Sequence, residues 1–158
     1  MTGDARATVL RRNPFLGRLY VLTFGLLAVS GFAQMPIFKR YYIADLPGLG
    51  WLAQYYVTHL LHYFAAAVLL GVVAYAVTGF VLDRRRALRL TPTGWARVAL
   101  LAGLLVTGVL RVVKNFSGFY MSAGWIVFLD MLHLALVMAY LAVALYALAA
   151  RKRWTSAA

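Results

Sequence analysis

Long apolar runs alternate along the chain with short polar segments that are mostly basic. Four runs, at about residues 19–35, 51–82, 95–113 and 124–149, are long enough to cross a bilayer, which takes about 17 to 25 helical residues. Consecutive spans joined by short loops run in opposite directions. The pattern therefore predicts an all-α fold, an up-down-up-down bundle of four transmembrane helices. Residues 1–158 are predicted to form a single integral membrane domain without internal repeats.

The composition supports a membrane protein rather than a soluble one. Of the 158 residues, 64% are hydrophobic and 13% are charged, whereas soluble domains have about half and about a quarter. One small core cannot cover so much apolar surface, so we expect lipid to cover it. The chain has no Cys, which excludes disulfides, thiolate-bound iron–sulfur clusters, covalently attached c-type haem and Cys-ligated zinc.

The distribution of charge predicts the orientation of the chain. A net charge of +12 would suggest nucleic acid as the partner of a soluble protein, but here the basic residues flank apolar runs, so no nucleic-acid binding is expected. Twelve of the 16 basic residues fall on one side of the bundle: Arg6, Arg11, Arg12, Arg18, Arg84, Arg85, Arg86, Arg89, Arg97, Arg151, Lys152 and Arg153. By the positive-inside rule, both termini are cytoplasmic. The first run also fits a cleaved signal peptide.

The three histidines are the main candidates for chemistry, because polar groups are costly inside a membrane helix. His59 and His62 belong to the second span, and His133 belongs to the fourth. At about 1.5 Å per residue from Trp51 and Trp125, all three lie in the outer half of the bilayer. The second and fourth spans are diagonal neighbours in the predicted bundle, so two imidazoles there could provide the axial ligands of one b haem. The alternative is that they form interhelical hydrogen bonds and bind nothing.

Three charged residues near the outer side have several possible roles. Arg111 and Lys114, with Lys39 and Arg40, are the basic residues on the side that topology disfavours. The first two could pair with haem propionates or extend to lipid headgroups. Asp130 could hold the imidazole of His133, accept a proton from a quinol, or pair with Arg111 or Lys114.

The segment Leu60–Phe64, with sequence Leu-Leu-His-Tyr-Phe, resembles a ligand motif on the second helix of a known family. This family comprises the cytochrome b, or gamma, subunits of respiratory formate dehydrogenases, hydrogenases and thiosulfate reductases, which are four-helix proteins with b haems. The resemblance implies that His62 and His133 are the haem ligands. It leaves His59 as a neighbour, a quinone partner, a propionate contact or the true ligand. The family's inner haem has no ligands here, because the first helix has no His and the other ligand position is Ala147.

These features predict an electron-relay subunit that does not make or break substrate bonds by itself. It would hold one haem b and exchange electrons with a quinone, of which menaquinone is the family's example. The resemblance implies a bacterial or archaeal inner membrane. It also implies peripheral redox subunits on the outer face, with iron–sulfur, molybdenum or multihaem c-type centres. The alternatives are a haem-free membrane anchor or assembly subunit, and a small transporter in which Asp130 and the histidines relay protons.

Overall fold

The structure, a computed structural model, describes residues 14–35, 37–84 and 87–157. Its four long helices are α2 (Pro14–Ala33), α4 (Tyr55–Gly79), α5 (Pro92–Val113) and α6 (Ala123–Ala149). Each is long and apolar enough to cross a membrane, α4 together with the residues that follow it up to Leu82. The prediction of an all-α membrane protein with four spans is therefore confirmed. The single bundle, the single domain and the cytoplasmic position of both termini stay predictions.

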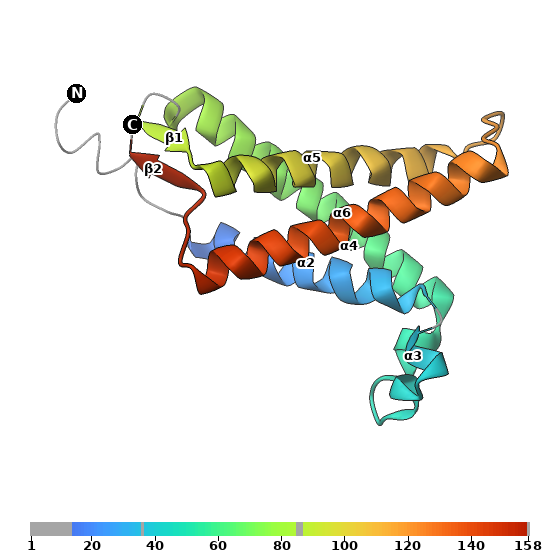
Figure 1. The fold of residues 1–158 in the computed structure, drawn as a ribbon. Helices are drawn as coiled ribbons and strands as arrows, with labels where there is room; N and C mark the ends of the chain where they lie inside the picture. The colour runs from blue at the N-terminus through green and yellow to red at the C-terminus, as the bar shows by residue number, and fades with distance from the viewer. Residues whose placement is uncertain (1–13, 36, 85–86, 158) are drawn as a thin grey trace. The chain divides into compact units, whose positions relative to one another are not determined.

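The chain divides into two compact units, residues 1–84 and 85–158. Each unit is built on a helical hairpin (Figure 1). The first hairpin consists of α2 and α4, drawn from blue to green, and the second consists of α5 and α6, drawn from yellow to red. We call the end at which the two helices of a hairpin are connected its loop end. Several basic residues used to predict the orientation lie outside the described residues: Arg6, Arg11, Arg12, Arg85 and Arg86.

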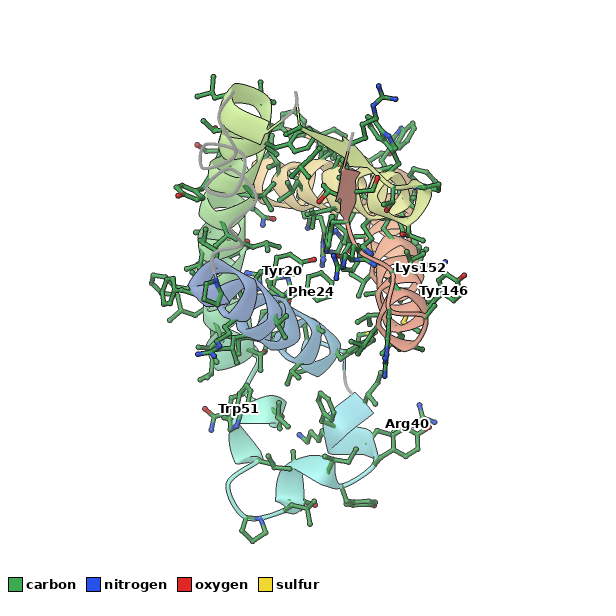
Figure 2. The ribbon with its side chains drawn as sticks, turned by 90° about the vertical axis from the view of Figure 1, so that its left-hand side faces the viewer. Tyr20, Phe24, Arg40, Trp51, Tyr146 and Lys152 are labelled. Atoms are coloured by element: carbon green, nitrogen blue, oxygen red, sulfur yellow. The ribbon has the colours of Figure 1, made fainter. Side chains whose placement is uncertain are left out.

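The connection at the loop end of the first hairpin consists of short helices. They are α3 (Ile37–Arg40), η1 (Ile43–Asp45) and η2 (Gly50–Ala53), and Figure 2 shows Arg40 and Trp51 on them. Trp51 lies in the 3-10 turn η2, so counting the α-helical rise from Trp51 is wrong, while the position of His59 and His62 in the outer half of the bilayer stays a prediction. The count begins at Tyr55, the first residue of α4, which places His62 roughly 10 Å along the helix.

The second hairpin has a small two-stranded sheet at the end opposite its loop end. This sheet was not predicted. Strand β1 (Leu88–Leu90) precedes α5 and pairs antiparallel with β2 (Thr155–Ala157), which follows α6. Thr91 caps α5, because its Oγ1 accepts a hydrogen bond of 3.0 Å from the Gly94 amide. Gly94 has no side chain to collide with the nearby carbonyl of Trp154. The segment after α6 is thereby held against the start of α5.

Candidate functional site: two histidines bonded to helix hydroxyls

His62 in α4 contacts the hydroxyl of Ser30 in the neighbouring helix α2. The distance from Ser30 Oγ to His62 Nδ1 is 3.0 Å, and Ser30 is completely buried. The same Oγ lies 2.7 Å from the carbonyl oxygen of Leu26, one turn earlier in α2. A buried Ser in a helix commonly donates its proton to that carbonyl. Ser30 therefore connects its own helix backbone to the imidazole of the partner helix.

This contact determines which imidazole nitrogen carries the proton. A hydroxyl has one proton to donate and two lone pairs that can accept. The Leu26 carbonyl can only accept, so the Ser30 proton points toward it and the oxygen must accept from the ring. Nδ1 of neutral His62 is then the protonated nitrogen, and Nε2 carries the lone pair. A metal-ligating His is held in the same way when its other nitrogen donates to a neighbouring acceptor.

The second hairpin repeats this arrangement around His133. The distance from Thr107 Oγ1 in α5 to His133 Nδ1 in α6 is 2.7 Å. Thr107 also donates to the carbonyl oxygen of Gly103, at 2.8 Å. The same reasoning gives the same tautomer, with the proton on Nδ1 and the lone pair on Nε2. We call these two interactions the hydroxyl–imidazole contacts.

Each hairpin has a second polar contact one turn closer to its loop end. In the first hairpin, His59 Nδ1 lies 3.2 Å from Gln34 Oε1. In the second, Arg111 Nε lies 2.8 Å from Asp130 Oδ1. We call these the loop-end contacts. One is neutral and the other is ionic, but both join the two helices of a hairpin.

The two hairpins therefore share a repeat that was not expected from the sequence. Gln34 follows Ser30 by four residues, as Arg111 follows Thr107, and His59 precedes His62 by three, as Asp130 precedes His133. No internal repeat was predicted from the sequence, and the correspondence described here concerns four positions of each hairpin. A signal was present: a hydroxyl residue followed by glycine, at 30–31 and at 107–108, in the helix before each candidate ligand.

The repeat separates the roles of the two histidines in α4. His62 occupies the position that His133 occupies in the second hairpin, whereas His59 corresponds to Asp130. His59 also packs between aromatic rings of its own helix, with centroid distances of 5.2 Å to Tyr55 and 4.4 Å to Tyr63. The contacts thus group His62 with His133, each bonded to a hydroxyl of the partner helix, and give His59 a contact to Gln34.

The structure favours one of the three roles considered for Asp130. Its carboxylate pairs with Arg111, while Nδ1 of His133 is bonded to Thr107. Arg111 is therefore engaged with an acid of its own hairpin. Lys114 follows α5 as its C-cap and is half-buried. Among the residues that the structure describes, no group of three or more His, Cys, Asp or Glu could hold a metal ion.

The hydroxyls of Ser30 and Thr107 and the amide of Gln34 were missed by sequence reasoning, which considered only charged groups and histidines. Comparisons with protein-family models, with curated proteins and with solved structures give no match. The resemblance to the cytochrome b subunits therefore depends only on the residues named for it in this sequence, Leu60–Phe64 and His133.

The loop-end contacts allow a test of the repeat by exchange. Replacing Asp130→His alone leaves Arg111 without its acid, and we expect it to lower the free energy of unfolding. Because both side chains are 35% exposed, the expected loss is only about 1 kcal/mol. Combining Arg111→Gln with Asp130→His installs the side chains of the first hairpin and should restore the stability. Thermal unfolding in detergent measures the stability of both variants. A double variant as unstable as Asp130→His alone would contradict the equivalence of the two loop-end contacts.

Proposed function

We propose that this protein is a mono-haem cytochrome b subunit that anchors a larger respiratory oxidoreductase in the membrane. It would relay electrons between peripheral redox subunits on its outer face and a quinone, for which menaquinone is the first candidate. The observation that carries this proposal is the matched pair of histidines, one in each hairpin, each with Nδ1 within hydrogen-bond distance of a hydroxyl that donates to its own helix. From this geometry we infer a proton on Nδ1 and a lone pair on Nε2 of each imidazole.

The residues fit a bis-histidine haem. A six-coordinate bis-histidine haem needs two neutral imidazoles, each providing a lone pair to iron, and the tautomer inferred for His62 and His133 leaves that lone pair on Nε2. When bound, the haem supplies reversible one-electron chemistry at its iron. The chain itself contributes two ligands from two separate hairpins, a fixed tautomer for each, and an apolar helix surface around them. Covalent attachment is not needed, in keeping with a chain without Cys.

The resemblance to the gamma subunits supports the same proposal with one difference. Ala147 stands where a ligand of the family's inner haem would lie, and α2 contains no His. We therefore propose a single haem, with His62 and His133 as its ligands. On this proposal, Arg111 contributes to a neutral ion pair with Asp130, and Lys114 is the better candidate for a haem propionate.

A haem-free membrane anchor or assembly subunit is the second candidate, and the hydroxyl–imidazole contacts favour it as well. Interhelical hydrogen bonds between Ser or Thr and His stabilise helix packing in membranes without any cofactor. Both candidates place the same side chains at the same positions. They differ in whether Nε2 of each imidazole binds iron.

The absorption spectrum distinguishes the two candidates. We expect a Soret band and a sharp α-band in the dithionite-reduced minus oxidised spectrum of the purified protein. The protein is produced in cells that make haem, or is reconstituted with haemin. The pyridine haemochrome assay should give about one haem per chain, because two ligands complete one iron. A folded protein that stays colourless after reconstitution would overturn the proposal in favour of the haem-free anchor.

A further inference from the structure

The hydroxyl–imidazole contacts have a feature that simple helix packing does not require. Both hydroxyls act twice, since each donates to a carbonyl of its own helix and accepts from an imidazole of the partner helix. Both are buried, with 0% of Ser30 and 4% of Thr107 exposed. The carbonyl bond removes the hydroxyl's freedom to donate to the ring. Each hydroxyl is thus an obligatory acceptor.

We infer that Ser30 and Thr107 are positioning residues that fix the tautomers of His62 and His133 and set the donor strength of their Nε2 atoms. A hydroxyl that rotates freely could donate to Nδ1 and stabilise the Nε2–H tautomer, which cannot bind iron through Nε2. The helix carbonyls of Leu26 and Gly103 prevent this rotation by holding the hydroxyl proton. The backbone of one helix thereby selects the protonation site on the other.

The same contacts determine how strongly each imidazole donates electrons. A hydrogen bond from the ring N–H to an acceptor raises the basicity of the other nitrogen. A hydroxyl that is itself donating is a better acceptor than an isolated one, because hydrogen bonds in a chain polarise each other. Greater basicity at Nε2 stabilises the ferric state of a bound haem over the ferrous state. This step depends on the proposed function, whereas the tautomer assignment does not.

The tautomers can be measured without haem. We expect ¹⁵N NMR of histidine-labelled, haem-free protein in detergent to show protonated Nδ1 at His62 and His133. Ser30→Ala should give a mixture of tautomers at His62 only, and Thr107→Val at His133 only. Ser30→Thr and Thr107→Ser keep the hydroxyl and should keep the tautomer. An Nε2–H tautomer in the wild type, or signals unchanged in Ser30→Ala and Thr107→Val, would overturn the inference.

Thr58→Val provides a matched control for the loss of a buried hydroxyl. Thr58 lies in α4, is completely buried, and has an Oγ1 that lies 3.2 Å from the Gln54 carbonyl oxygen and 3.0 Å from that of Tyr55. Its hydroxyl thus bonds its own helix as Ser30 does, without a histidine at the other side. We expect Thr58→Val to leave both tautomers unchanged. A change equal to that of Ser30→Ala would mean that the effect comes from packing.

The second readout is the midpoint potential of the haem-loaded protein. Ser30→Ala and Thr107→Val should each raise it, because the ligand becomes a weaker donor. We expect roughly a tenfold shift of the ferric–ferrous equilibrium, which corresponds to about 59 mV for one electron. Failure of the wild type to bind haem would overturn the proposed function and leave the NMR result standing. Haem bound at unchanged potential in both variants would overturn the effect on donor strength alone.

Discussion

Replacing His62 or His133 by Ala is expected to abolish haem binding, whereas His59→Ala is expected to retain it. A six-coordinate b haem without covalent links depends on both axial bonds, so the loss of one should lower haem content at least tenfold, more than the loss of a supporting hydrogen bond. The equivalence of His62 and His133 in the two hairpins is the reason for choosing them. Haem per chain is measured with the pyridine haemochrome assay after reconstitution under identical conditions.

His59→Ala is the matched control, because it removes an imidazole from the same helix one turn away. It breaks the contact to Gln34 without touching Ser30 or His62. Circular dichroism and gel filtration of all three variants separate loss of a ligand from loss of the fold. If His59→Ala is colourless while His62→Ala keeps its haem, the ligand assignment is wrong and the repeat does not mark the ligands.

The four spans could be predicted from the sequence because lipid imposes a simple rule on the chain. Every backbone polar group in the bilayer must be bonded within the chain, so a long apolar run is helical almost by necessity. The errors occur where this rule does not apply. Trp51 lies in the connection between two spans, where the chain forms a 3-10 turn. The pairing of Leu88–Leu90 with Thr155–Ala157 joins segments far apart in the sequence, which no local pattern indicates.

The candidate site could be predicted only in part. Histidine is rare and costly in a membrane helix, so His59, His62 and His133 could be identified as candidates, and only the resemblance chose His62 over His59. Ser30 and Thr107 could not, because Ser and Thr are common in such helices and bond their own backbone there. Asp130 had several possible partners on neighbouring helices, and only the register of α5 against α6 identifies Arg111. The sequence thus indicates the rare groups, while the helix register determines their partners.

Gly31→Ala is expected to weaken haem binding and Gly108→Ala to leave it unchanged, although both glycines follow the hydroxyl residue of their hairpin. A Cβ on Gly31 would lie 3.2 Å from Cε1 and 3.6 Å from Nδ1 of His62. The imidazole must then move by a few tenths of an ångström, which disturbs its contact with the hydroxyl of Ser30. A Cβ on Gly108 would lie 3.8 Å from Cε1 of His133, which is an ordinary contact.

Gly31→Ala should therefore weaken haem binding by roughly tenfold, the scale found when support of a ligand is lost. Gly108→Ala should bind haem as the wild type does, and its helix should be slightly more stable, since Ala is favoured over Gly in a helix by up to about 1 kcal/mol. Titration of haem-free protein with haemin measures the affinities, and thermal unfolding measures the stabilities. Equal loss of affinity in both variants would contradict this explanation, because it would trace the effect to general overpacking rather than to the orientation of one imidazole.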